Sequence, residues 1–350
     1  MTEQTMRAKR VLVGMSGGVD SSVCAALLQR QGWEVTGVTL RTWREGAEGN
    51  EAEDAARVAS HLGIAHYVLD SRERFYQQVV QPFIHSYEQG KTPNPCILCN
   101  RHVKFGLMME EALAGGFDAL ATGHYASIGC RDGEYTLSTA PFDAKDQSYV
   151  LYNLTQQQLA HVVLPLAPYP KEEIRAMAQE MGLPVAHKKD SQEICFIPDD
   201  DYAGFICRMT GREYPAGAFV DQQGQTIGQH RGIIHYTVGQ RKGLGAFGKP
   251  MFVLEIRPHN NTIVLGEKGQ EYRGQLLCEQ VNWIAGRPPQ FPLRCTARVR
   301  YKAPRAACTV TPEGEDRLRV EFDQPQRAVT PGQAVVFYQE EQVLGGGVIL

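Results

Sequence analysis

Residues 14–22 read GMSGGVDSS and directly follow the apolar run VLV. Gly17 and Gly18 have no Cβ, so the main chain can approach a ligand closely there. Consecutive backbone amides at a strand-to-helix turn form an anion-binding nest, and the dipole of a helix N-terminus adds to it. A Walker loop ends in Gly-Lys-Ser/Thr, whereas this stretch has no lysine. We therefore predict a phosphate-binding turn that is not a Walker loop; an ordinary tight turn with a serine cap is the alternative.

Two cysteines, Cys96 and Cys99, form a Cys-x-x-Cys pair in KTPNPCILCN, residues 91–100. A structural zinc site needs four ligands, and the sequence has no second Cys-x-x-Cys pair. A thioredoxin-like redox pair is another alternative, although the surrounding sequence is not thioredoxin-like. Pro93 and Pro95 indicate a loop, and thiols on a loop beside a phosphate-binding sheet are candidates for catalysis. We predict no metal site.

Cys195 lies in KKDSQEICFI, residues 188–197. The neighbouring His187, Lys188 and Lys189 favour the thiolate, which is the reactive form of cysteine. A strand cysteine that faces the core is the alternative interpretation of ICFI. The chain has nine cysteines in 350 residues, and such an odd, scattered set is not typical of a secreted disulfide scaffold. We therefore expect reduced thiols.

Apolar runs and helical periodicity predict the elements that hold these residues. Strands are expected at 10–15, 34–40, 65–70 and 117–126, and helices at 20–32, 53–63, 74–90 and 102–116. This βαβα order predicts an α/β fold with a Rossmann-like parallel sheet and helices on both of its faces. Ligands bind beyond the carboxyl ends of such strands, which is where residues 14–22 lie.

The pattern changes near residue 200. Helices are expected at about 155–182, and later apolar runs are short and broken by glycine and proline. From about residue 274 the chain reads as strands only, which predicts a small antiparallel β-barrel. We expect a catalytic domain at 1–205, a small central domain at 206–273 and the barrel at 274–350.

Composition and charge limit the possible functions. A net charge of −3 neither indicates nor excludes nucleic-acid binding, because local basic patches matter more than the sum. The first residues lack the apolar core of a signal peptide, and no run approaches the ~18 apolar residues that cross a membrane. We expect a cytoplasmic protein with no membrane partner.

The loop resembles the pyrophosphatase-type loop of enzymes that cleave ATP to AMP and pyrophosphate while they adenylate a substrate oxygen. Over nearly its whole length the chain resembles the bacterial tRNA-specific 2-thiouridylase family, whose members place sulfur on the wobble uridine of tRNA. The motifs that carry the resemblance are GMSGGVDSS, TPNPCILCN, ATGHYA, KDQSY, DSQEICF, YTVGQRKGLG, VRYKAP and LGGGVIL.

The resemblance implies a role for each matching residue. Contacts with ATP are implied for Gly14, Met15, Ser16, Gly17, Gly18, Val19, Asp20, Ser21, Leu40 and Gly123. Cys99 takes the position of the catalytic nucleophile, and Cys195 that of the cysteine that carries persulfide sulfur. Asn94, Pro95 and Cys96 match the residues that contact the target base, although many members have aspartate in place of Cys96. Contacts with tRNA are implied for His124, Lys145, Asp146, Gln147, Arg300, Tyr301 and Gln333.

The resemblance also implies the chemistry. ATP, with Mg²⁺, adenylates the C2 oxygen of the uracil in tRNAs of the lysine, glutamate and glutamine type. Persulfide sulfur then replaces this oxygen, and its donor is a cysteine desulfurase or a sulfur-relay protein. Either Cys99 attacks the Cys195 persulfide and frees sulfide, or the persulfide attacks C2 and Cys99 resolves it. Both routes form a Cys99–Cys195 disulfide and need an external reductant.

Binding of tRNA needs cations on one face of the protein. In RCTARVRYKAPR, residues 294–305, Arg294, Arg298, Arg300 and Lys302 share one parity, which on a strand is one face. A solvated barrel face is the alternative. Two other functions stay open as well: an ATP-dependent amide ligase with the same type of loop, and a non-catalytic RNA-binding module.

Overall fold

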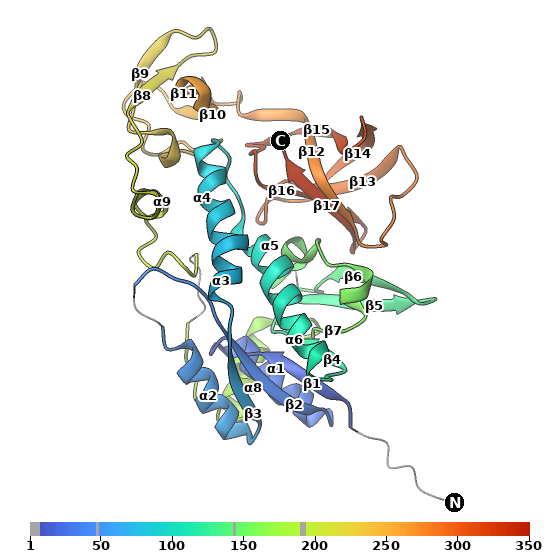
Figure 1. The fold of residues 1–350 in the computed structure, drawn as a ribbon. Helices are drawn as coiled ribbons and strands as arrows, with labels where there is room; N and C mark the ends of the chain where they lie inside the picture. The colour runs from blue at the N-terminus through green and yellow to red at the C-terminus, as the bar shows by residue number, and fades with distance from the viewer. Residues whose placement is uncertain (1–7, 47–48, 143–144, 190–193) are drawn as a thin grey trace, which may run out of the picture.

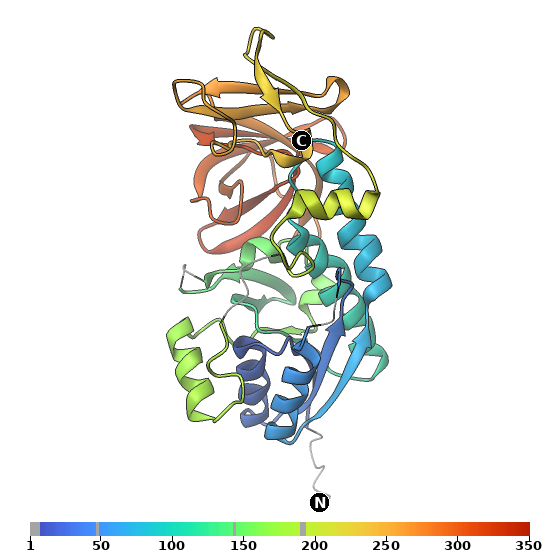
Figure 2. The same cartoon turned by 90° about the vertical axis from the view of Figure 1, so that its left-hand side faces the viewer.

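The computed structural model describes residues 8–46, 49–142, 145–189 and 194–350. A parallel sheet with its helices lies at one end of an elongated molecule, and the middle domain and the C-terminal barrel lie at the other (Figure 1). The view turned by 90° shows the hairpin of β5 (Ala126–Arg131) and β6 (Glu134–Thr139) between the sheet and the barrel (Figure 2).

The parallel sheet has the strand order β3-β2-β1-β4-β7. Its strands are β1 (Arg10–Gly14), β2 (Glu34–Arg41), β3 (Ala65–Asp70), β4 (Ala119–Ala121) and β7 (Val162–Val163). The predicted parallel sheet is confirmed. The expected strand 117–126 is shorter, because the chain leaves the sheet after β4 and enters the hairpin. β7 was not expected, since two residues give no periodicity in the sequence.

Helices cover both faces of the sheet, as predicted. α1 (Val19–Arg30), α2 (Glu51–Leu62) and α8 (Lys171–Glu180) share one apolar core with Val11 and Val13 of β1. On the other face, α6 (Met108–Ala114) packs in a second core with Leu12. Alternate residues of β1 therefore point to opposite layers, which is the period of a strand.

A helical segment connects β3 to β4. Its elements are α3 (Arg72–Phe75), the π-helix η1 (Tyr76–Val80), α4 (Gln81–Glu88), α5 (Pro95–Cys99), the π-helix η2 (Asn100–Leu107) and α6. The Cys-x-x-Cys pair lies on α5, so the prediction that this segment is a loop is wrong. Pro95 is in the first turn of α5, where its missing N–H has no intrahelical partner to lose. The Asn94 side chain caps the helix by accepting a hydrogen bond from Cys96 N at 3.1 Å.

The middle domain contains a four-stranded sheet of order β10-β11-β8-β9. Its strands are β8 (Gly217–Val220), β9 (Thr226–His230), β10 (Met251–Arg257) and β11 (Thr262–Glu267), and α9 (Tyr202–Thr210) precedes them. Phe219 and Val253 of this sheet share a core with Phe83 of α4 and Phe205 of α9. This shared core fixes the middle domain to the helical segment of the first domain.

The predicted antiparallel barrel is confirmed. Its strands are β12 (Tyr272–Trp283), β13 (Leu293–Arg298), β14 (Ala306–Glu313), β15 (Arg317–Arg327), β16 (Ala334–Gln339) and β17 (Gln342–Ile349). They follow the order β12-β15-β14-β13-β16-β17, and β12 pairs with β17 to close the barrel. β6 pairs with the start of β17, so the hairpin of the first domain extends the barrel sheet. Further short helices in the described ranges are η4 (Ser148–Leu151), α7 (Gln156–Leu159), η5 (Ile233–His235) and η6 (Pro258–Asn260).

A buried ion pair joins the barrel to the first domain. The Asp146 carboxylate accepts hydrogen bonds from Ser148 N at 3.1 Å, Ser148 Oγ at 2.9 Å and Arg298 Nη1 at 3.1 Å. None of the Asp146 side chain and only 12% of the Arg298 side chain is exposed. Because Arg298 ends β13, the pair fixes the segment after the hairpin to one strand of the barrel.

We predict that Arg298→Met destabilises the protein by about 3 kcal/mol, because it leaves the Asp146 carboxylate buried without its cation. The double variant Asp146→Asn/Arg298→Met should regain a large part of this loss. Urea unfolding followed through tryptophan fluorescence measures the change. Arg294→Met is the matched control, because Arg294 is on the same strand as Arg298 but forms an exposed pair with Asp323 of β15. Its loss should cost less than about 1 kcal/mol. Equal losses in Arg294→Met and Arg298→Met would contradict the prediction.

Candidate active site

Residues 14–18 turn the chain from the carboxyl end of β1 into α1. Gly17 has φ +65°, and a Cβ there would lie 2.6 Å from Glu51 O, so this position requires glycine. Gly18 is the N-cap of α1, and the first amides of a helix have no intrahelical partner. Met15 and Val19 are buried in the core, so they can offer a ligand only their backbone. The loop has the geometry of an anion-binding turn.

The serines of the loop have different tasks. Ser21 Oγ accepts a hydrogen bond from Ser16 N at 3.1 Å, and Ser22 Oγ donates one to Gly18 O at 2.8 Å. The side chains of Ser21 and Ser22 are buried, whereas Ser16 is exposed. Ser21 and Ser22 therefore maintain the shape of the loop, and Ser16 is the one of the three that a ligand in solution can reach.

Three strand ends bring the expected nucleotide-binding residues to one edge of the sheet. Gly14 ends β1, Leu40 is half-buried near the end of β2, and Gly123 follows β4. A Cβ on Gly123 would lie 2.9 Å from Ser21 N and from the carbonyl carbon of Asp20. Glycine at this position therefore allows the end of β4 to touch the first turn of α1.

A lysine far along the chain reaches the start of α1. Lys171 Nζ, at the start of α8, donates a hydrogen bond to Asp20 Oδ1 at 2.6 Å, and Tyr125 OH donates to the same oxygen at 2.7 Å. Lys171 is buried. Lys171 was not predicted as a site residue, although the sequence carries one signal: a lysine in the first turn of a helix opposes the helix dipole.

Lys188 also binds the loop. Its Nζ donates to Gly17 O at 3.0 Å and to Asp54 Oδ2 at 2.6 Å. The hydrogen bond from Lys188 is the largest cause that lowers the pKa of Asp54. The expectation that Lys188 favours the Cys195 thiolate is therefore wrong, because the side chain turns to the phosphate loop and is held there by a carboxylate.

The two thiols of α5 differ in exposure. Cys96 is exposed and Cys99 is half-buried. Burial raises the pKa of Cys99 to about 12, Lys104 lowers it, and the charges of Cys195 and Cys96 raise it further. The three thiols are therefore close enough to influence one another, and all nine cysteines are free.

Cys195 lies outside any helix or strand, which excludes the alternative of a core strand cysteine. The Cys195 side chain is exposed to solvent. The protein around it raises its pKa by desolvation, Cys96 raises it further, and Lys104 and Arg44 lower it. Lys104 was not predicted as a site residue; it is a half-buried residue of η2 that lowers the pKa of both Cys99 and Cys195.

Several residues expected to contact the base or the tRNA have partners within the protein. Asn94 caps α5 and Pro95 is buried. Gln333 Nε2 donates to Thr92 O at 2.8 Å. The barrel therefore holds the segment just before α5, which we call the thiol helix because it carries both cysteines of the Cys-x-x-Cys pair. Asp146 is enclosed in the ion pair that joins the barrel to the first domain.

His124 and Gln147, two further residues expected to contact tRNA, also have partners within the protein. His124 is buried, and its Nδ1 lies 2.8 Å from Thr122 Oγ1. Burial, and then the charge of Lys104, hold the pKa of His124 well below its usual range, so the ring is neutral near physiological pH. Gln147 Oε1 accepts a hydrogen bond from Tyr125 N at 3.0 Å.

Tyr301 and Lys145 complete the set of expected tRNA contacts. Tyr301 is half-buried, and its ring centroid lies 6.0 Å from that of Tyr149. Burial raises the pKa of Tyr301, and the charges of Asp146 and Cys96 contribute, which places this residue between the barrel and the thiol helix. Lys145 is half-buried and follows residues 143–144, which lie outside the described residues.

The expected basic strand face is only partly present. β13 ends at Arg298, so Arg300 and Lys302 lie in the turn that follows it. Arg294 pairs with Asp323 of β15, and Arg298 pairs with the buried carboxylate described above. These acids come from distant parts of the chain, so the strand's own sequence does not show them. Arg300 and Lys302 are exposed and form no ion pair within the described part of the chain.

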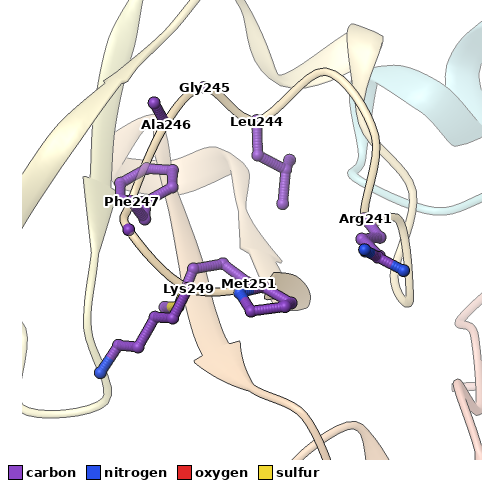
Figure 3. A pocket seen from close by; sticks show the side chains of 9 residues that line it. Arg241, Leu244, Gly245, Ala246, Phe247, Lys249 and Met251 are labelled. Atoms are coloured by element: carbon purple, nitrogen blue, oxygen red, sulfur yellow. The ribbon is translucent and has the colours of Figure 1, made fainter.

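The middle domain carries a pocket in the glycine-rich stretch before β10. Arg241 and residues 244–251 line it (Figure 3). Lys249 Nζ lies 2.5 Å from Glu267 Oε1, so this cation is paired.

Within the described ranges, no group of three or more His, Cys, Asp or Glu residues could hold a metal ion. No helix in those ranges is both long enough and apolar enough to span a bilayer.

Family models match nearly all of the chain. A model described as the tRNA methyl transferase HUP domain matches residues 9–199, which is more than half of the chain. A tRNA methyl transferase PRC-barrel domain matches residues 203–267, and an aminomethyltransferase beta-barrel domain matches residues 273–349.

The alignments with curated relatives span almost the whole of this chain and of each relative. The tRNA-specific 2-thiouridylase MnmA of Clostridioides difficile (strain 630) is 48% identical, over 97% of this chain and 98% of the relative. The protein of the same name from Acetivibrio thermocellus is 49% identical, over 98% and 100%. That from Desulfitobacterium hafniense (strain Y51) is 50% identical, over 98% of each chain. Identity at this level over nearly complete chains shows that this protein belongs to the tRNA-specific 2-thiouridylase family.

Proposed function

We propose that this chain uses ATP to replace the C2 oxygen of the wobble uridine of tRNA with sulfur. The supporting observation is a series of neighbouring residues that connects the phosphate loop to the interacting thiols. Gly123 contacts the first turn of α1, and the next residue, His124, is near Lys104. The same Lys104 acts on both Cys99 and Cys195. One continuous site can therefore bind ATP and transfer sulfur.

ATP supplies the leaving group. The C2 oxygen of uracil leaves poorly, so it first attacks the α-phosphorus of ATP and displaces pyrophosphate. The adenylated oxygen then leaves as AMP when a sulfur nucleophile attacks C2. The backbone amides of the loop and the hydroxyl of Ser16 are placed to hold the phosphates, and electrostatic stabilisation of this type is a large term in such reactions.

Sulfur reaches C2 by one of two routes. In the first, the Cys99 thiolate attacks the inner sulfur of the Cys195 persulfide, a disulfide forms and hydrosulfide leaves to attack C2. In the second, the outer persulfide sulfur attacks C2 and AMP departs. Cys99 then attacks the Cys195 sulfur, and the thiolated base leaves. Each route ends with a Cys99–Cys195 disulfide, which an external dithiol must reduce by two electrons.

Magnesium would arrive with ATP. Mg²⁺ typically binds one or two carboxylates together with substrate phosphates and keeps several waters. Asp20 is a carboxylate in the first turn of α1, directly after the loop, and 32% of its side chain is exposed, so the residues present fit this mode. Bound there, the ion would neutralise charge on the phosphates.

We propose a tRNA surface formed by the turn after β13, which we call the barrel turn, and by the part of the chain next to α5. Arg300 and Lys302 are its exposed cations. The exposed Cys195 is open to a sulfur-donor protein, which we propose to be a cysteine desulfurase or a sulfur-relay protein. We propose a cytoplasmic location, where such partners and tRNA meet. An amide ligase is not favoured, because the curated relatives are named thiouridylases.

We predict that Cys99→Ser and Cys195→Ser each eliminate thiolation, whereas Cys96→Asp stays active and Cys96→Ser loses less than either. A thiol in the wrong place cannot replace the nucleophile, since about 1 Å of displacement can cost roughly a hundredfold in rate. Thiolation of unmodified tRNA and peptide mapping of the oxidised enzyme provide the test. A mapped Cys96–Cys195 bridge together with an active Cys99→Ser enzyme would make Cys96 the nucleophile instead.

A second prediction concerns pH. Because the pKa of Cys99 is raised to about 12, its thiolate fraction should rise about tenfold per pH unit from about pH 8 to about pH 10 without levelling off. Iodoacetamide labelling with mass spectrometry measures this rate, and glutathione is the control that levels off near its own pKa. Lys104→Gln should slow the labelling of Cys99 at each pH. A plateau near pH 8 would show that the free enzyme holds Cys99 as a thiolate.

A third prediction concerns the barrel turn. Arg300→Gln should weaken tRNA binding and reduce the slope of log affinity against log salt by about 0.7–0.9, the contribution of one phosphate contact. Arg294→Gln is the matched control, because Asp323 already neutralises Arg294. Filter binding at several salt concentrations gives both values. If the two variants behave alike, the turn is not part of the tRNA surface.

A further inference from the structure

Two buried cysteines of the barrel face each other across neighbouring strands. Cys295 of β13 is directly opposite Cys308 of β14 in the antiparallel register, and the two sulfur atoms lie 3.7 Å apart. Both side chains belong to the apolar core of the barrel. The proposed sulfur transfer uses neither of them, so that function leaves this pair of thiols unexplained.

The backbone around the pair has the spacing that a disulfide needs. Residues directly opposite each other on antiparallel strands have Cα atoms about 4.5–5.5 Å apart, and disulfides join Cα atoms about 4.4–6.8 Å apart. Both side chains lie in the same core, and the sulfur atoms are already in contact. Rotation about the side-chain bonds can therefore bring the sulfurs to the bonding distance of about 2.05 Å without separating the strands.

The surroundings of the pair favour one thiolate. The hydrogen bond from Cys308 lowers the pKa of Cys295, burial opposes this change, and the charge of Arg294 supports it. The same hydrogen bond, together with burial, raises the pKa of Cys308. By contrast, burial raises the pKa of Cys278, another cysteine of the barrel core, to about 12. The thiolate is the form of cysteine that reacts with oxidants, so Cys295 is the more reactive member of the pair.

We propose that Cys295 and Cys308 form a reversible disulfide when the protein meets a hydroperoxide, and that this bond fixes the barrel turn. The Cys295 thiolate attacks one oxygen of hydrogen peroxide, the O–O bond breaks, and Cys295 becomes a sulfenic acid. The hydroxide that leaves takes up the proton that Cys295 released. The sulfur of Cys308 then attacks the sulfur of Cys295, the S–O bond breaks, and the second hydroxide takes the Cys308 proton. Two thiols and one peroxide thus give one disulfide and two waters, and a dithiol reverses the bond by supplying two electrons.

The disulfide closes the hairpin that carries the barrel turn. β13 ends at Arg298 and β14 begins at Ala306, and the turn between them contains Arg300 and Lys302. The two cysteines are 13 positions apart, so the bond encloses the whole turn in one covalent ring. The ring limits the conformations of the opened hairpin, and opening therefore becomes less favourable.

Oxidation of the reduced, full-length protein with hydrogen peroxide tests the proposal. The remaining thiols are blocked with iodoacetamide in denaturant, and tryptic peptides are mapped without reduction. Trypsin cleaves between the two cysteines at Arg298, so a Cys295–Cys308 bond appears as two linked peptides. We expect this link in the parent protein, and dithiothreitol should remove it. The variant Cys99→Ser/Cys195→Ser should form the link equally well, because the barrel pair acts independently of sulfur transfer.

Hydrogen exchange measures the effect of the bond on the hairpin. Peptides of β13 and β14 should exchange roughly ten- to a hundredfold more slowly in the oxidised parent than in the reduced parent. In Cys308→Ala, peroxide treatment should leave this exchange unchanged. Cys278 is the matched control within one molecule, since it is buried in the same core and should stay unmodified under conditions that link the pair.

A purely structural role of the pair predicts different results. Two buried cysteines can serve simply as small apolar side chains of the core. If the exposed Cys130 is oxidised while the barrel pair stays reduced, that role is the correct one. Oxidation of Cys278 to the same extent as the pair would show general opening of the barrel and would also overturn the inference. A linked pair with unchanged hydrogen exchange would contradict the fixing of the barrel turn.

Discussion

The shared carboxyl edge of β1, β2 and β4 is the constraint on which the site depends. Parallel strands end at the same edge of a sheet, so the turns that follow them meet there. The phosphate loop follows β1, Leu40 lies near the end of β2, and Gly123 follows β4. The approach is close enough that a Cβ on Gly123 would collide with the backbone of α1. A change in the register of β4 would therefore displace both the start of α1 and the residues that follow Gly123.

The fixed positive charges of the site come from outside the loop. Lys171 and Lys188 reach it from the region after β7, and Lys104 acts on the thiols from η2. Lysine side chains are long and flexible, so a carboxylate partner is needed to hold each one in place. Asp20 and Asp54 have this function for the two loop lysines. The site thus gains positive charge without a lysine in the loop itself.

The barrel contributes to the site by holding other parts in position. The buried pair between Asp146 and Arg298, the hydrogen bond from Gln333 to Thr92 O and the pairing of β6 with β17 all connect it to the first domain. Residues expected to touch tRNA are therefore partly structural. Their contacts leave Arg300 and Lys302 exposed in the turn after β13.

The sequence alone determined the parallel sheet, the barrel and the phosphate turn, because each depends on a local pattern. Apolar runs of strand length, helical periodicity and paired glycines act over a few neighbouring residues. The resemblance to a family added the expected roles of Cys99 and Cys195. Local patterns also misled: Pro93 and Pro95 suggested a loop, although Pro95 begins α5.

Only the tertiary structure decided which charges meet. Arg294 and Arg298 look free in their own strand, yet acids from distant segments pair with them. Lys188 is close to Cys195 in sequence, but its ammonium group binds Gly17 O. Ion pairs act through space, and among the described residues their partners lie as many as 163 residues apart, as for Arg208 and Glu45. No local pattern contains that information, so the folded chain had to supply it.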